Sequence, residues 1–166
     1  MVWSTYACAA TILALGEFYA QIRLLPYARA AKQAGTLEDA GLRLVEAVCE
    51  RLKAGEYDDT ATPARLHGDL WAGNVLYARH SSGSIEAVLI DPAAHGGHRL
   101  TDLAMLALFG TEHLERVLAT YADTAALPTR WRELIGLHQL HPLLVHAVTH
   151  GPSYGRQVRK IAAEYA

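Results

Sequence analysis

Two short apolar stretches with a polar residue at each outer end constrain this chain more than any other feature. Residues 67–74 read His-Gly-Asp-Leu-Trp-Ala-Gly-Asn, and the apolar stretches 75–78 and 85–90 follow around a Ser-Ser-Gly turn. Short apolar runs around such a turn predict a β-hairpin. Because a hairpin returns the chain to its starting point, Asn74 and Asp91 are expected to lie together at its base. We expect the second strand, ending at Val88-Leu89-Ile90, to be buried.

The spacing of three polar side chains around this hairpin favours phosphoryl transfer. Asp69 precedes Asn74 by five positions, and Asp91 ends the second strand. Kinase-like phosphotransferases use the pattern H-x-D-x-x-x-x-N with a second Asp downstream. One carboxylate accepts a hydroxyl proton, while an amide oxygen and the second carboxylate hold Mg²⁺ against the phosphates of ATP. The prediction is that Asp69 is the catalytic base and that Asn74 and Asp91 are metal ligands. The alternative is that all three are turn residues.

Three further residues are assigned weaker or supporting roles. His67 is predicted to pack and hydrogen-bond within the loop rather than to react. Asp102 lies in the first turn of a predicted helix, where an acid is favourable, and in related kinases a corresponding acid anchors the loop backbone. Trp71 lies beside the predicted base, where its ring either stacks on a sugar or aliphatic substrate or packs as an ordinary aromatic.

Three stretches of sequence resemble the C-terminal lobe of fructosamine kinases (ketosamine kinases). This family is a branch of the aminoglycoside phosphotransferase and choline kinase group. The stretches are GEFYAQIRLLPYARAA, HGDLWAGNVL with LIDPAAHGGHRLTDLAMLALFG, and LHQLHPLLVHAVTHGPSYGRQ. Trp71 and the Asp-Pro-Ala at 91–93 are similar to the fructosamine kinase versions of their motifs. The resemblance covers residues 16–160. It implies ATP and Mg²⁺ as cofactors, a ketosamine or glycated amine as substrate, and phosphorylation of its O3 hydroxyl, which begins deglycation.

The expected fold is mainly α with a small β-hairpin, the C-terminal lobe of a protein-kinase-like phosphotransferase. Residues 1–166 are expected to form one domain, with 1–15 matching the family poorly and 67–91 forming the loop and metal-binding hairpin. Because we find no Gly-rich loop or strand lysine before residue 67, the N-terminal lobe is expected to be absent and the chain alone to be inactive.

The local pattern also predicts where helices begin and end. Residues 3–25 are compatible with a helix that Pro26 should end or bend. Thr36-Leu37-Glu38-Asp39 resembles a capping box, which predicts a helix opening there. Gly96-Gly97 is expected to form a tight turn. Residues 101–109 are expected to form a compact helix closed by Gly110.

Composition argues against several other classes of protein. Lys plus Arg number 15 and Asp plus Glu number 17, a formal net charge of −2, so no basic surface indicates nucleic-acid binding. Cys8 and Cys49 are too few and too far apart for a disulfide framework, which predicts a reducing cytoplasm. The sequence has no run of about 18 apolar residues, so no membrane span is expected. The oligomeric state stays open.

Two other functions remain open at this stage. The chain could be a truncated lobe that folds without catalysing, or that serves only as a binding module. It could also keep the kinase chemistry but act on an aminoglycoside, a choline-like amine or another amino sugar, since acidic residues in a cleft attract any cationic acceptor.

Overall fold

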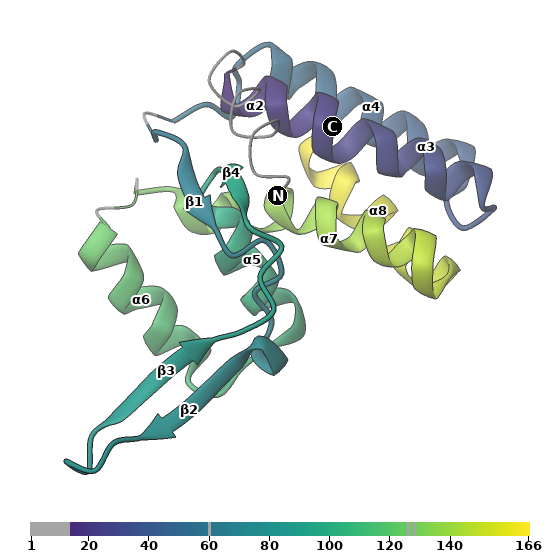
Figure 1. Cartoon of the computed structure of the whole chain (residues 1–166). Helices are drawn as coiled ribbons and strands as arrows, with labels where there is room; N and C mark the ends of the chain where they lie inside the picture. Colours follow the sequence, from purple (N-terminus) through teal and green to yellow (C-terminus); the bar gives the residue numbers. More distant parts are fainter. Residues whose placement is uncertain (1–13, 60, 126, 128) are drawn as a thin grey trace, which may run out of the picture.

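The computed structural model describes residues 14–59, 61–125, 127 and 129–166, and it is mainly helical (Figure 1). The helices are α2 (Leu15–Phe18), α3 (Leu25–Gln33), α4 (Asp39–Lys53), α5 (Leu100–Phe109), α6 (Leu114–Ala125), α7 (Ile135–His150) and α8 (Pro152–Tyr165). A π-helical turn covers Tyr19–Leu24, and 3₁₀ turns cover Ala72–Asn74 and Trp131–Leu134. The strands are β1 (Ala64–Leu66), β2 (Val75–Arg79), β3 (Ile85–Leu89) and β4 (His95–Gly97). No helix in the described residues is both long and apolar enough to cross a membrane.

The first described helix does not end at Pro26. The chain runs from α2 through the π-helical turn into α3, which carries Pro26 in its first turn. The N–H of Leu25 donates to the carbonyl of Ala20, five residues back, so the turn widens just before the proline. Pro26 therefore occupies a position near the start of α3 where a proline is tolerated, since its missing N–H is not required there. The predicted helical residues 3–13 lie outside the described part.

The predicted capping box at Thr36–Asp39 is wrong. Helix α4 begins at Asp39, and Glu38 precedes it without a side-chain cap. The Thr36 hydroxyl instead donates to the carbonyl of Ala31, 3.0 Å away, and so satisfies an acceptor at the end of α3. A hydroxyl in a short connection between two helices can bond to either of them, and the sequence alone does not say which.

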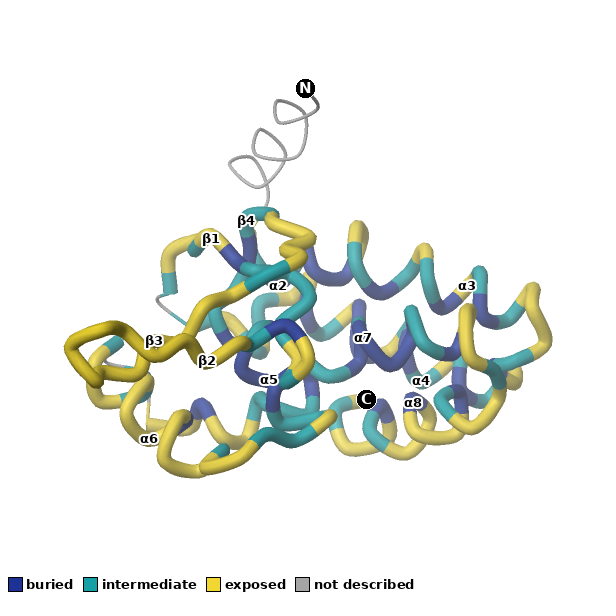
Figure 2. Tube along the Cα trace, turned by 60° about the horizontal axis from the view of Figure 1, so that its bottom comes forward, coloured by how far each residue is buried: buried dark blue, intermediate teal, exposed yellow. Residues whose placement is uncertain are grey.

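The larger hydrophobic core lies among α3, α4, α7 and α8 (Figure 2). Helix α7 contacts α3, α5 and α8, and it contributes the fully buried side chains of Leu140, Leu143 and Leu144. Val48 of α4 and Val158 of α8 pack into the same cluster. A smaller cluster joins α5, α6 and the Trp131 turn.

The predicted hairpin is present, and a second strand pair was missed. Strands β2 and β3 pair antiparallel from Val75 opposite Leu89 to Arg79 opposite Ile85. Gly96-Gly97 is not a tight turn, because it belongs to β4, which pairs antiparallel with β1. Strands of three residues leave too short a sequence pattern to separate them from a loop.

The expectation of a buried strand at Val88–Ile90 is wrong. The hairpin extends away from the helices, and all residues of β3 are exposed (Figures 1 and 2). Val88 is 39% and Leu89 52% exposed. Apolar side chains alone cannot bury a strand when the described elements do not cover its faces.

Candidate active site

The 67–74 loop is joined to helix α5 by the side chain of Asp102. One carboxylate oxygen of Asp102 accepts the backbone N–H of His67 at 2.7 Å, and the other accepts that of Gly68 at 2.9 Å. Charged acceptors make the stronger class of hydrogen bond to backbone amides. Since α5 packs against α7, these two bonds connect the loop to the core of the molecule.

His67 links the start of the loop to the residue that follows β3. Its Nε2 lies 2.9 Å from the carbonyl oxygen of Ile90, and its Nδ1 lies 3.3 Å from the backbone N–H of Asp69. A carbonyl can only accept, so Nε2 carries the proton and Nδ1 accepts from Asp69. With both ring nitrogens in use, the imidazole holds the backbone on both sides of the site.

Asp69 and Asn74 lie in direct contact across the loop. The amide nitrogen of Asn74 donates to the backbone carbonyl of Asp69 at 2.8 Å and to its carboxylate Oδ2 at 3.1 Å. Asn74 is 6% exposed, while Asp69 is half-buried. Because the amide nitrogen is used on Asp69, the amide oxygen is the atom of Asn74 that can face a metal ion.

Asp91 directly follows the residue whose backbone is bonded to Asn74 at the base of the hairpin. The backbone N–H of Ile90 donates to the carbonyl of Asn74 at 3.1 Å, which places these two chain segments side by side. Asp91 is exposed and has a φ of 51°. Asp is one of the few residues other than Gly that tolerate this left-handed conformation. The chain therefore turns sharply at the predicted metal ligand itself.

Gly68 is a site residue that the sequence did not single out. Its φ is 83°, and a Cβ added there would lie 2.2 Å from the carbonyl oxygen of Ala93 and 2.8 Å from Nδ1 of His95. Only glycine fits this approach, which packs the loop against the segment after Asp91. Burial lowers the pKa of His95 below its ordinary value, more than its hydrogen bond to the Ala93 carbonyl raises it. The sequence feature that could have pointed to Gly68 is the Gly-Asp pair, which is common in loops.

Trp71 lies on the surface of the loop. Its side chain is 44% exposed, its backbone N–H donates to the Asp69 carbonyl at 3.2 Å, and its own carbonyl accepts from the Asn74 N–H at 2.9 Å. The backbone of Trp71 is therefore fixed between the predicted base and a predicted metal ligand, while the indole remains accessible.

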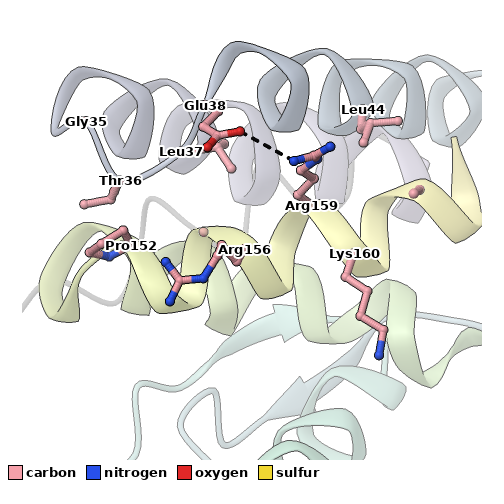
Figure 3. Close-up of a pocket in the computed structure, with 11 residues that line it drawn as sticks. Gly35, Thr36, Leu37, Glu38, Leu44, Pro152, Arg156, Arg159 and Lys160 are labelled. Carbon is pink, nitrogen blue, oxygen red and sulfur yellow. Dashed lines mark ion pairs between the residues drawn. The ribbon is translucent and has the colours of Figure 1, made fainter.

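Two hollows in the described part of the chain have similar volumes, but only one of them borders this site. One, of about 720 Å³, lies between the hairpin, α5 and α6, and His67, Leu70 and Asp102 contribute to its wall. The other, of about 600 Å³, lies between the α3–α4 turn and α8, where Arg159 pairs with Glu38 (Figure 3). The second hollow contains none of the predicted site residues, so it plays no part in the assignment.

The side chains at the hairpin base fit Mg²⁺ better than a transition metal. Among the described residues, no group of three His, Cys, Asp or Glu side chains is placed to hold a metal ion. Asn74 and Asp91 together offer an amide oxygen and a carboxylate. Mg²⁺ is commonly bound through one or two protein oxygens together with water and substrate phosphates, which agrees with a pair of ligands beside an open surface.

Comparison with known proteins identifies the family. The family model described as fructosamine kinase matches residues 11–165. A protein of Lactiplantibacillus plantarum named a probable ketoamine kinase is 32% identical over 151 residues, covering 89% of this chain and 51% of that protein. Another of the same name from Enterococcus faecium is 38% identical over 104 residues, covering 63% of this chain and 36% of that protein.

A solved structure agrees with the sequence relatives. The crystal structure of a protein described as a fructosamine-3-kinase, from Thermobifida fusca, superimposes with a TM-score of 0.80 at 50% identity, covering 90% of this chain and 50% of that one. The chain thus spans between about a third and a half of the length of these relatives. It belongs to the fructosamine kinase family.

Proposed function

We propose that this chain forms the catalytic lobe of an ATP-dependent kinase that phosphorylates the O3 hydroxyl of ketosamines. The observation that carries the proposal is the contact between Asn74 and Asp69, 3.1 Å from amide nitrogen to carboxylate, at the base of the hairpin that ends in Asp91. We treat residues 1–166 as one domain equivalent to the C-terminal lobe of a kinase-like fold. Family membership supports a kinase, and the chemistry of the loop supports the roles assigned below.

Asp69 is the proposed base. The O3 oxygen of the acceptor bonds to the γ-phosphorus of ATP, the bond from that phosphorus to the β–γ bridging oxygen breaks, and ADP leaves. The hydroxyl proton passes to the Asp69 carboxylate. The hydrogen bond from the Asn74 amide holds that carboxylate in one orientation, so less freedom is lost when the acceptor binds.

Asn74 and Asp91 are the proposed magnesium ligands, through the amide oxygen and the carboxylate. Bound Mg²⁺ would neutralise charge on the phosphates as the reaction proceeds. The contribution of the chain itself is to hold the backbone segments that carry the two ligands next to each other, through the bond from the Ile90 N–H to the Asn74 carbonyl.

The remaining predicted residues act on position and recognition. His67 and Asp102 are positioning residues, since their contacts are with the loop backbone. Trp71 is proposed to bind the acceptor, because its indole is accessible beside Asp69 and a flat apolar face suits a sugar ring or an alkyl chain. Transfer of a phosphate to O3 would destabilise the adduct and so begin deglycation.

A coupled assay of ADP formation tests this function. In a protein that joins this lobe to an N-terminal kinase lobe, we expect a fructosyl-amine to accelerate ADP release from MgATP, Asp69→Asn to remove most of the acceleration, and ³¹P NMR to locate the new ester on O3. The 166-residue chain by itself is expected to bind MgATP weakly and to show little or no turnover, because phosphoryl transfer depends on positioning by both lobes. Matched assays with an aminoglycoside and with choline test the other acceptors. A clear preference for either would contradict the ketosamine assignment. In the two-lobed protein, calorimetric binding of MgATP and acceptor without ADP formation would instead identify a catalytically silent binding module.

A further inference from the structure

Residue 73 is a glycine, although its own backbone conformation does not require one. It lies within the 3₁₀ turn Ala72–Asn74, and it is not among the glycines with positive φ. An alanine would therefore be acceptable to the backbone and would be favoured over glycine in a helical turn. The reason for glycine must be sought in what surrounds the Cα atom.

The indole of Trp71 occupies the space that a side chain at 73 would need. A Cβ built on Gly73 would lie 2.3 Å from Cη2 and 2.3 Å from Cζ2 of Trp71, and 2.8 Å from Cε2. These distances are far inside van der Waals contact. The ring is thus folded back over the turn and lies against Gly73.

We infer that Gly73 is a positioning residue that holds the Trp71 indole against the loop and leaves its other side open to the acceptor. This inference rests on the proposed role of Trp71 in acceptor binding. Trp71 as a residue is 44% exposed, which fits a side chain with one side covered. Since the backbone of Trp71 is bonded to both Asp69 and Asn74, a fixed indole also fixes the acceptor relative to the base.

Gly73→Ala separates the position of the ring from the structure of the loop. The added methyl group cannot enter without moving the indole, whereas the 3₁₀ turn accepts alanine. We expect the acceptor to bind about three- to tenfold more weakly, the range for loss of one well-placed aromatic contact. Affinity for MgATP is expected to stay within about twofold, because the nucleotide does not depend on this ring.

A double-mutant cycle tests the coupling directly. If Gly73 acts only through the ring, Gly73→Ala should have no effect on acceptor affinity in a Trp71→Ala background. Calorimetric titration of a fructosyl-amine into the wild type, the two single variants and the double variant gives the coupling free energy between Gly73 and Trp71. An equal loss in both backgrounds would show that alanine disturbs the loop itself, and it would overturn the inference.

A spectroscopic measurement decides the same question without acceptor. In the chain labelled with 5-fluorotryptophan, the ¹⁹F resonance assigned by Trp71→Phe should shift on Gly73→Ala, while that of the buried Trp131 stays in place. If the Trp71 resonance had the same chemical shift in the wild type and in Gly73→Ala, the inferred contact between the indole and Gly73 would be wrong. If the wild-type chain fails to bind a fructosyl-amine, the proposed function fails, and the resonance still decides the relation between the two residues.

Discussion

At the residue scale, a substitution at Asp69 can change catalysis without changing the fold. Replacing its carboxylate by an amide in Asp69→Asn keeps the shape and removes the proton acceptor. In a longer protein that carries this lobe together with an N-terminal kinase lobe, we expect kcat on a fructosyl-amine to fall by about 10²- to 10⁴-fold, the usual contribution of a general base, with nearly unchanged affinity for MgATP and thermal midpoint. Steady-state kinetics with thermal melts measure this. The matched control is Asp123→Asn, which makes the same change at an exposed position on α6. If Asp69→Asn kept most of the wild-type kcat, the role of Asp69 as a base would be wrong and the 67–74 loop would be a structural feature only.

Asp102 is the opposite case, because substituting it should lower the stability of the fold. Asp102→Ala removes the acceptor of two backbone N–H groups in a part-buried setting. Each unsatisfied donor costs about 1–3 kcal/mol, so the urea midpoint should fall clearly, and Asp102→Asn, which keeps one oxygen acceptor, should fall less. Equal midpoints for alanine and asparagine would show that the two bonds contribute little to the fold.

The sequence was informative about residues whose spacing is local and uninformative about their distant partners. Asp69 and Asn74 are five positions apart, so their contact could be anticipated from a short loop. The bond between His67 and the Ile90 carbonyl joins segments 23 residues apart and depends on how the hairpin leaves the loop. The close approach of Gly68 to Ala93 depends on the same arrangement. Spacing alone does not contain that information.

At the scale of elements, the packing of α8 against the α3–α4 turn depends on one glycine. A Cβ on Gly155 would lie 1.9 Å from the backbone carbonyl oxygen of Thr36, and a backbone atom cannot rotate away as a side chain can. Gly155→Ala should therefore force α8 outward and destabilise the chain by about 1–3 kcal/mol, although alanine favours the helix itself. Denaturant unfolding measures the loss. Ser153→Ala, on the exposed part of the same helix, should be nearly neutral.

Element type was easier to predict than burial. The hairpin and the helix ending at Gly110 follow from turn residues and periodicity, which are local properties. The exposure of Val88 and Leu89 does not, because an apolar strand is buried only when another element covers it. The same limitation applies to β1 and β4, three residues each and joined across the chain.

At the scale of the whole molecule, histidines inside the fold make stability depend on pH. Burial lowers the pKa of His138 well below its ordinary value, with a smaller contribution from the adjacent His98. Burial likewise lowers the pKa of His141 to about 4. His138 is bonded to Thr101 of α5, and His141 to the carbonyl of Arg23, so these rings connect α7 to two other parts of the chain.

The sign of the pH dependence follows from these lowered values. Well above pH 6.5 the two histidines are neutral in both the folded and the unfolded chain, so they add no pH dependence. Below pH 6.5 the unfolded chain takes up protons that the folded chain does not, and stability falls as the pH drops towards 4. We expect the urea midpoint to decrease steadily between pH 6.5 and 4. His141→Gln should reduce the slope by about one proton. A midpoint that is flat or rises through this range would contradict the burial of neutral histidines in the fold.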